Sequence, residues 1–215
     1  MLRSDQGKYR KDYTRGGLNK SSCPSDPFKL LALWLDEAVE QSGDEPSMVL
    51  STVGGKGRPS SRVVLLKGLD DKGLYFYSNY KSRKGRELSS NPYAAANFFW
   101  QELERQIRIE GVTERIPAVM SDLYFETRPE EARINAVISP QSEKVPDRDS
   151  LIQMQKQFSR DLESGKKTLE RPEYWGGYVI IPSVIEFWQG RSGRLHDRIE
   201  YRKKNTDWEV SRLAP

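Results

Sequence analysis

The sequence is nearly without the two residue types that build many catalytic and metal sites. It has one cysteine, Cys23, and one histidine, His196, among 215 residues. A lone cysteine excludes a disulfide within the chain, and one Cys with one His excludes a Cys/His zinc site within one subunit. Any mechanism that requires two histidines in one subunit is also excluded.

Long apolar runs and signal-like segments are missing as well. No stretch is long enough to span a bilayer, and the N-terminus has no apolar signal core. The first residues are rich in Arg and Lys, but Asp5 and Asp12 argue against a transit peptide. We therefore expect a cytoplasmic protein with no membrane partner.

The composition predicts one compact domain with a charged surface. Hydrophobic residues make up 36% of the chain and charged residues 31%, and the net charge is +4. The 35 basic and 31 acidic residues are mixed along the chain, which favours a compact anionic ligand over nucleic acid. We expect residues 1–24 to be a mobile N-terminal segment and residues 25–215 to form a single domain.

Helical spacing predicts a first helix after Ser25-Asp26-Pro27, which has the pattern of an N-cap and a first-turn proline. Apolar residues then recur with helical periodicity, and Ser42-Gly43 is expected to end this helix. The other predicted helices cover 118–138, with 131–138 as a separate helix after Pro129, and 149–163.

Short β-like runs separated by turn residues dominate the rest of the chain. Glycine-containing connectors at 54–57 and 70–73 predict hairpin turns. The regular spacing predicts an antiparallel sheet that closes into a barrel, with helices between two groups of strands, and the fold class is α+β. The predicted strands are 48–53, 63–66, 74–78, 94–100, 106–112, 178–181, 185–188, 199–202 and 208–210.

A basic helix start is the first sign of a ligand. Ser82 has the character of an N-cap, which places Arg83 and Lys84 in the first turn. Cations there oppose the helix dipole at a cost of roughly 0.3–1 kcal/mol each. An anion such as a phosphate docked at this helix start would explain them better than a solvated basic loop does.

The segment from Arg62 to Lys67 places a cation at each end of four apolar residues. We expect a strand buried on both faces. Ordinary solvation of the strand ends explains the two cations equally well, so the segment alone does not decide between structure and binding.

The segment 186–198 surrounds the lone histidine with arginines. On an extended strand Arg194, His196 and Arg198 would share one face, and they would repel one another unless an anion lay between them. Trp188 could cover an aromatic ligand. Asp197 would point to the opposite face, poorly placed to orient His196, and no Gly-x-Ser-x-Gly elbow is present, so a hydrolase is disfavoured.

Two further stretches carry weaker signals. Gln106 lies with Arg108 and Glu110 on one face of an alternating strand, and Gln141 and Ser142 lie in a loop. Each could bond a heterocycle, although each alone is more typical of a polar surface. An aromatic cofactor with a phosphate would use the cations for its charge and apolar burial for its rings.

With these residues in view, the chain resembles the pyridoxine/pyridoxamine 5′-phosphate oxidase family from about Arg10 to Pro215. The resemblance implies a split β-barrel homodimer with two FMN sites at the subunit interface. The most specific matches are Arg62 to Lys67, Ser82-Arg83-Lys84, Glu104 to Gly111, Trp175 to Tyr178, Ile185 to Gly190, Arg194 to Arg198 and Arg212 to Pro215.

The resemblance also assigns site residues. The residues it implies for FMN, partly from the other subunit, are Arg62, Val63, Val64, Leu65, Leu66, Lys67, Tyr77, Ser78, Arg83, Lys84, Gln106, Gln141, Ser142, Trp188 and Arg198. Those it implies for the substrate are Arg10 and Tyr13 on a closing N-terminal segment, Lys67, Tyr124 and Arg128 at the phosphate, and Arg194 and His196 at the pyridine ring.

The implied reaction converts pyridoxine or pyridoxamine 5′-phosphate to pyridoxal 5′-phosphate. A hydride passes from the substrate C4′ carbon to flavin N5, and O2 then reoxidises the flavin and gives H2O2. Arg194 and His196 are the implied catalytic residues, with Arg194 favouring developing charge. Whether His196 accepts a proton or donates a hydrogen bond is left open.

Two positions depart from the family pattern. Ala132 stands where the family usually has Ser after Arg128-Pro129, so one hydroxyl to the substrate phosphate is missing. Asn135 replaces a usual Gly, which puts the local backbone in question. The main rival interpretation is a split-barrel FMN-binding relative with another substrate or no oxidase activity. A nucleic-acid-binding protein is the second rival.

Overall fold

The computed structural model describes residues 12–43 and 45–215. The chain divides into two compact units. Unit 1 comprises Met1–Met48, Ala96–Glu110 and Pro182–Pro215, and unit 2 comprises Val49–Ala95 and Gly111–Ile181. Arg10 lies outside the described residues, so its predicted contact with the substrate stays a prediction.

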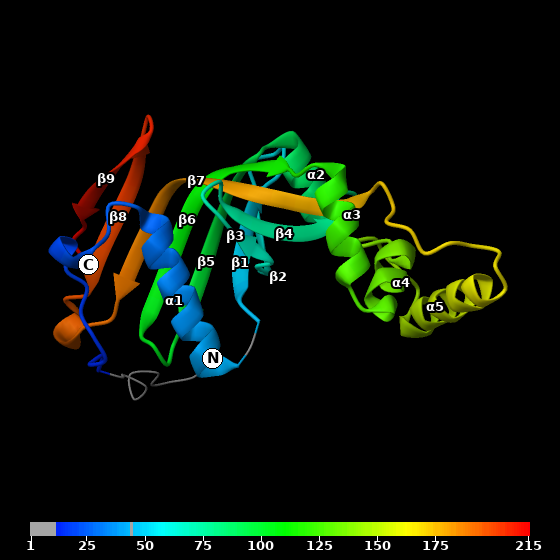
Figure 1. The fold of residues 1–215 in the computed structure, drawn as a ribbon, viewed down its shortest axis with the longest axis horizontal. Coiled ribbons are helices and arrows are strands. Elements are labelled where there is room, and N and C mark those ends of the chain that lie inside the picture. The colour runs from blue at the N-terminus through cyan, green and yellow to red at the C-terminus, as the bar shows by residue number, and fades with distance from the viewer. Residues whose placement is uncertain (1–11, 44) are drawn as a thin grey trace, which may run out of the picture. The chain divides into compact units, whose positions relative to one another are not determined.

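The described chain combines antiparallel strands with helices that lie between groups of strands (Figure 1). Hydrogen bonds link the strands in the order β2-β1-β5-β6-β7-β4-β3, and β8 joins β7 and β9. The strands are β1 (Ser47–Val53), β2 (Pro59–Leu65), β3 (Gly68–Leu69), β4 (Leu74–Asn79), β5 (Tyr93–Trp100), β6 (Arg105–Arg115), β7 (Trp175–Gln189), β8 (Asp197–Lys204) and β9 (Asp207–Arg212). The α-helices are α1 (Pro27–Ser42), α2 (Arg83–Ser90), α3 (Ala118–Thr127), α4 (Glu130–Ile138) and α5 (Arg148–Glu163).

In unit 1, helix α1 packs on the strand β7. The Asp26 side chain accepts a hydrogen bond from the Phe28 N–H, and Gly43 ends the helix in the left-handed conformation, with φ of 69°. The buried face includes Trp34, whose ring meets Phe187 of β7 edge-on at 5.3 Å between centroids. The predicted first helix is confirmed. Strand β8 pairs with β7 from Val184↔Arg202 to Gln189↔Asp197.

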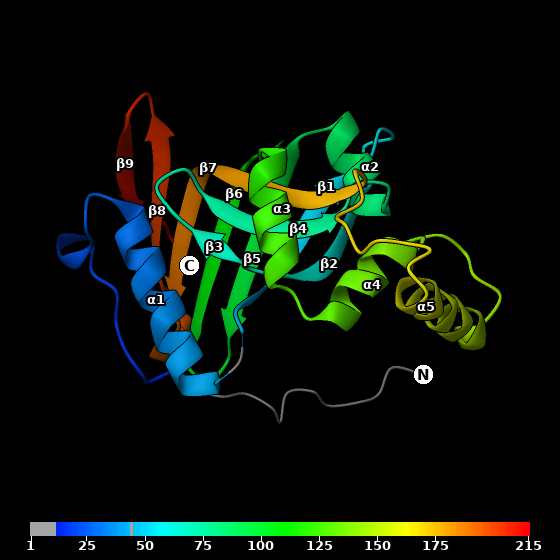
Figure 2. The same ribbon diagram turned by 45° about the vertical axis from the view of Figure 1, so that its right-hand side comes forward.

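In unit 2, strand β4 pairs with the first half of β7, from Leu74↔Ile180 to Asn79↔Trp175. The predicted turn before β4 is confirmed, because Asp70 N–H bonds the Gly73 carbonyl. A Cβ at Gly73 would lie 1.9 Å from the Ile180 carbonyl oxygen, so only glycine fits. Helices α4 and α5 lie side by side (Figure 2), and both confirm predicted helices.

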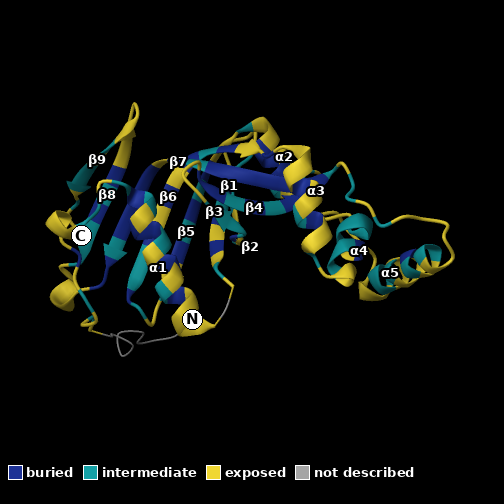
Figure 3. Cartoon of the chain, in the orientation of Figure 1, coloured by how far each residue is buried: buried dark blue, intermediate teal, exposed yellow. Residues whose placement is uncertain are grey.

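Two predictions about strands were wrong. The strands expected at 178–181 and 185–188 are one continuous strand, β7, because Pro182 lies between the residues paired with β4 and those paired with β8. The strand containing Val63 is not buried on both faces. It ends the strand order, and Val63 is 65% exposed. By contrast, the central strand β7 is largely buried (Figure 3).

A third wrong prediction concerns the arginine–histidine segment. Arg194 and His196 do not continue an extended strand with Arg198, because Ser192–Arg194 forms a short 3-10 turn and β8 begins only at Asp197. Gly193 and Arg194 both have positive φ, 65° and 62°. The three side chains therefore do not share one strand face.

Candidate active site

The candidate residues fall into separate clusters, and each cluster lies within one unit. Unit 2 holds a cationic cluster at the start of α2 and an aromatic stack beside α3. Unit 1 holds the histidine with Trp188 and Tyr13.

The start of α2 positions Lys84. The Ser82 side chain caps the helix by accepting a hydrogen bond from Gly85 N–H at 3.3 Å, as predicted. Lys84 Nζ then contacts Ser78 Oγ at 2.9 Å, Ser82 Oγ at 3.4 Å and Gln141 Oε1 at 3.0 Å. The structure thus brings Ser78, Lys84 and Gln141 together from three separate segments.

None of these three partners of Lys84 carries a negative charge. All three are neutral oxygens, and burial, followed by repulsion from Arg62, lowers the pKa of Lys84 to about 8. An ammonium group at a helix start among neutral acceptors gains most from a bound anion. The donor set therefore fits the phosphate of FMN.

Glu87 organises the two arginines of this cluster. Its Oε1 accepts a hydrogen bond from Arg83 Nε at 2.9 Å, and its Oε2 forms an ion pair with Arg62 Nη2 at 3.3 Å. Burial favours the neutral acid, but hydrogen bonds from Ser60, Thr52 and Arg83 outweigh it and lower the pKa of Glu87 to about 2. The sequence reasoning missed Glu87, although its place four residues after Arg83 is a helical ion-pair spacing.

An aromatic stack in unit 2 carries two of the residues expected at the substrate. The rings of Tyr77 and Tyr124 stack at 3.8 Å between centroids, and Trp175 continues the stack 5.6 Å from Tyr77. The Arg128 guanidinium lies 4.6 Å from the Trp175 ring centre. Burial lowers the pKa of Arg128, and its buried Nη1 has no hydrogen-bond partner among the described residues.

That orphan donor fits an anionic ligand, because a buried N–H without a partner is costly. Lys67 follows β2, and its backbone N–H bonds the Tyr75 carbonyl at 2.8 Å. Ala132 and Asn135 both lie inside the regular helix α4, and Asn135 is not among the residues with positive φ. Asn135 therefore adopts an ordinary helical backbone conformation, and a glycine is not required at this position.

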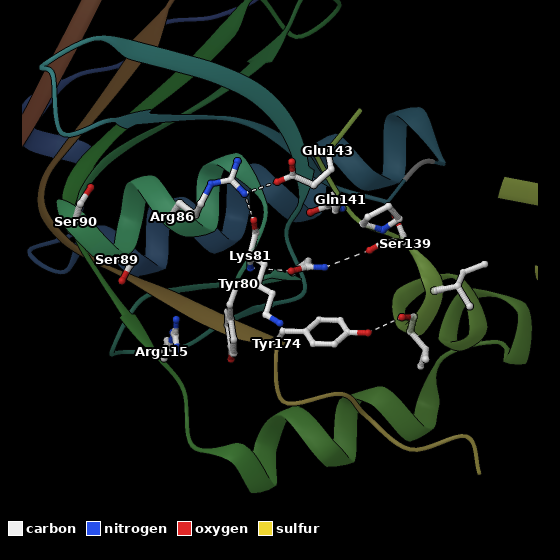
Figure 4. A pocket seen from close by; sticks show the side chains of 14 residues that line it. Tyr80, Lys81, Arg86, Ser89, Ser90, Arg115, Ser139, Gln141, Glu143 and Tyr174 are labelled. Carbon is white, nitrogen blue, oxygen red and sulfur yellow. Dashed lines mark hydrogen bonds and ion pairs between the residues drawn. The ribbon is translucent and has the colours of Figure 1, made fainter. Parts of the chain in front are cut away.

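A cavity of about 760 Å³ adjoins the Lys84 cluster in unit 2, and the sequence did not predict it. Arg86 forms an ion pair with Glu143 at 2.7 Å, and Lys81 Nζ lies 4.9 Å from the Tyr174 ring centre. Figure 4 shows these four side chains around the cavity. Gln141 lines this cavity and also accepts the hydrogen bond from Lys84. The two sites therefore share a side chain.

In unit 1, His196 belongs to an aromatic group. The Tyr13 ring lies 5.7 Å from both Trp188 and His196, and Trp188 lies 4.8 Å from His196. His196 Nδ1 accepts a hydrogen bond from Arg191 N–H at 3.1 Å. A neutral His196 must then carry its proton on Nε2, which leaves Nε2 a donor.

Carboxylates hold the described N-terminal residues of this unit. Glu104 Oε2 accepts hydrogen bonds from Thr14 and Arg15 N–H at 2.8 and 2.9 Å. Asp197 Oδ2 accepts one from Leu18 N–H at 3.0 Å. Asp197 is thus occupied away from His196, consistent with the argument against a catalytic triad.

Arg198 is committed to a buried acid that the sequence reasoning did not anticipate. Its Nε and Nη2 bind the two oxygens of Glu186 at 2.8 and 3.0 Å, and this pairing raises the pKa of Arg198. Arg108 Nη1 contacts the same carboxylate at 3.1 Å. The alternation predicted for Gln106, Arg108 and Glu110 is confirmed, since Ile107 and Ile109 between them are buried.

Several residues that were predicted to bind cofactor or substrate do not take part in these clusters. Arg194 is exposed and makes no hydrogen bond or ion pair with any described residue. Val63 and Leu65 are 65% and 43% exposed, and Ser142 lies in an exposed turn with φ of 73°. The remaining predicted cofactor residues Val64, Leu66 and Gln106 are at least partly covered.

The described residues contain no cluster of three or more His, Cys, Asp or Glu side chains able to hold a metal ion. None of their helices is long and apolar enough to cross a membrane.

Comparisons with known proteins show which family the chain is related to. Residues 35–157 match the family model "Pyridoxamine 5′-phosphate oxidase", and residues 175–215 match "Pyridoxine 5′-phosphate oxidase C-terminal dimerisation region". A pyridoxine/pyridoxamine 5′-phosphate oxidase from Ectopseudomonas mendocina is 50% identical, with 96% of each chain covered. The enzyme of that name from Polynucleobacter asymbioticus is 48% identical, covering 96% of this chain and 97% of the relative.

Solved structures show the same fold. PhzG from Burkholderia lata 383, in complex with tetrahydrophenazine-1-carboxylic acid, superposes with a TM-score of 0.84 at 32% identity and covers 92% of this chain and 98% of its own. An FMN-binding protein of Nostoc punctiforme gives 0.70 at 15% identity, covers 90% of this chain and 100% of its own, and supports the fold alone. The α+β split-barrel prediction is confirmed, and the chain belongs to the pyridoxine/pyridoxamine 5′-phosphate oxidase family of oxidoreductases.

Proposed function

We propose that this chain binds FMN and oxidises pyridoxine 5′-phosphate or pyridoxamine 5′-phosphate to pyridoxal 5′-phosphate. Dioxygen is the electron acceptor and becomes H2O2, and the amine substrate also consumes water and releases ammonia. The single observation that carries the proposal is the Lys84 ammonium at the start of α2, whose hydrogen bonds to described residues all go to neutral oxygens. The family relationship supports FMN as the ligand of that anion site.

The cofactor phosphate is assigned to Arg62, Arg83 and Lys84, which the contacts of α2 hold close together. When bound, FMN supplies the two-electron acceptor for the substrate carbon. The remaining cofactor residues would shape the ring site and exclude water. They are Val63, Val64, Leu65, Leu66, Lys67, Tyr77, Ser78, Gln106, Gln141, Ser142, Trp188 and Arg198.

Arg128, Tyr124 and Lys67 are assigned to the substrate phosphate. The unpartnered Nη1 of Arg128 supports this, because an incoming phosphate oxygen would satisfy it. Because Ala132 has no hydroxyl, the substrate phosphate would receive one hydrogen bond fewer. We therefore expect weaker substrate binding but the same reaction. Arg10 and Tyr13 would cover the substrate from the N-terminal side.

Arg194 and His196 are assigned to the pyridine ring. The hydrogen bond from Arg191 N–H to His196 Nδ1 supports a donor role for His196 Nε2, so we propose that this histidine binds a substrate oxygen or nitrogen and takes no proton from it. Arg194, exposed and unpaired with described residues, is available to stabilise negative charge that develops on the substrate.

We also propose a homodimer, with each FMN site completed by residues of both subunits. The match of residues 175–215 to a dimerisation region supports it. So do the exposed apolar side chains of Val63 and Leu65, which lie among the expected cofactor residues and would be covered by a partner.

The test is a peroxide assay on flavin-loaded protein with pyridoxine 5′-phosphate, pyridoxamine 5′-phosphate and unphosphorylated pyridoxine. We expect peroxide and pyridoxal 5′-phosphate from the two phosphates and far less from pyridoxine. The 32% identity to PhzG favours one alternative, an oxidase of a different ring substrate on the same fold. Bound FMN with no turnover of either phosphate would reject our proposal in favour of that alternative.

A further inference from the structure

A buried acid lies within the cluster that we assign to the FMN phosphate. Glu87 is only 9% exposed, and it carries its charge throughout the neutral range because its pKa is lowered to about 2. A carboxylate there repels a phosphate, which makes its presence in an anion site unexpected. Its contacts must therefore offset that repulsion.

Among the described residues, the hydrogen bonds to the Glu87 carboxylate all come from side chains. Thr52 Oγ1 and Ser60 Oγ donate to Oε2 at 2.5 and 2.6 Å, and Arg62 Nη2 lies 3.3 Å from the same oxygen. Arg83 Nε donates to Oε1 at 2.9 Å. One carboxylate thus joins β1, β2 and the first turn of α2.

Arg62 and Arg83 differ in the contacts that they make besides Glu87. Arg62 has further contacts, with the Leu50 carbonyl at 3.2 Å, Thr52 Oγ1 at 2.6 Å and Ser60 Oγ. The Arg83 side chain is 61% exposed, and Glu87 is its hydrogen-bond partner among the described residues. Without Glu87, a flexible exposed Arg83 would sample many rotamers, and Arg62 would lose its charged partner.

We propose that Glu87 is a positioning residue for phosphate recognition: it fixes the guanidinium groups of Arg62 and Arg83 so that they are preorganised for the phosphate of FMN. This inference rests on the proposed function. Preorganisation reduces the ordering cost of binding, and here it outweighs the repulsion between carboxylate and phosphate.

A purely electrostatic role and a positioning role for Glu87 predict opposite changes in FMN affinity when Glu87 is substituted. In Glu87→Gln the size is kept and the negative charge is removed. If Glu87 acted only through its charge, the variant would bind FMN more tightly. If it positions the arginines, the variant binds FMN more weakly, by about tenfold, the order expected for losing one charge-assisted contact.

The experiment measures dissociation constants of FMN and riboflavin, which lacks the phosphate, on the full-length apoprotein. We expect Glu87→Gln to weaken FMN about tenfold and to leave riboflavin within about twofold. A general loss of structure would weaken both flavins equally, and that result would overturn the proposal, as would tighter FMN binding. The thermal midpoint of each apoprotein is recorded alongside.

Two further variants complete the design. Glu114→Gln is the matched control, since Glu114 is an exposed acid of the same unit paired with Lys72 at 2.9 Å, and it should change neither constant. Ser60→Ala removes one donor to Glu87 and serves if Glu87→Gln does not fold; a smaller but selective loss of FMN affinity is expected, and no selective loss would contradict the proposal. Wild-type protein with no preference for FMN over riboflavin would instead reject the proposed function.

Discussion

The lowered pKa of Lys84 leads to a specific pH dependence of FMN binding. Burial, followed by repulsion from Arg62, places that pKa at about 8 in the ligand-free chain, and the contacts of Nζ are neutral oxygens. A bound phosphate favours the charged ammonium and raises the pKa again. In the range above about pH 7, where the phosphate is mostly dianionic, affinity is therefore highest while Lys84 is protonated and falls as the pH rises through 8.

The magnitude follows from linkage. Above pH 8 each pH unit reduces the protonated fraction of free Lys84 about tenfold, so the FMN dissociation constant should be about tenfold larger at pH 9 than at pH 7. Riboflavin, titrated in parallel, should show no such change. The assay is fluorescence titration of apoprotein with each flavin at several pH values.

The matched variant is Lys84→Arg. A guanidinium stays protonated throughout this range, so the ratio of FMN to riboflavin affinity should stay flat between about pH 7 and 9.5. Equal pH dependence in the wild type and the variant would refute the assignment of Lys84 to the phosphate. A wild-type ratio that does not change with pH would refute it as well.

Three other predictions concern unit 1. Arg194→Ala should reduce turnover about 100-fold while changing the FMN dissociation constant less than about twofold; equal loss of both would show that its role is misassigned. Glu186→Gln should lower the free energy of unfolding in urea by about 1.5–3 kcal/mol, because the half-buried Arg198 loses its charged partner, the buried Glu186 carboxylate; an unchanged midpoint and slope would contradict this. Glu104→Gln should speed tryptic cleavage after Arg15 about tenfold, since the carboxylate accepts the backbone N–H bonds there, and an unchanged cleavage rate would argue against that role.

Local sequence signals predicted most elements of the fold. The cap at Asp26 and Pro27 and the left-handed Gly43 defined α1, and Ser82 correctly predicted the start of α2. These helix ends depend on residues within one or two helical turns, so the local sequence is enough to predict them. The strand prediction divided β7 in two, because the local sequence does not show that residues 175–180 pair with β4 while residues 184–189 of the same strand pair with β8.

The candidate site was predictable only where residues are close in sequence. Arg83 and Lys84 could be inferred from the helix start, but the gathering of Glu87 with Thr52 and Ser60 joins residues 35 and 27 positions apart. The exposure of Val63 was missed because an apolar run does not reveal whether the chain itself or a partner covers it. Such contacts depend on tertiary structure, which the hydrophobic pattern does not specify.

The most direct test of the central claim is an anaerobic titration of the purified, FMN-loaded protein with pyridoxine 5′-phosphate. We predict that the substrate bleaches the visible absorbance of the bound flavin, and that air restores it with formation of pyridoxal 5′-phosphate and peroxide. A protein that retains FMN but whose flavin spectrum does not change with either pyridoxine or pyridoxamine 5′-phosphate would contradict the claim.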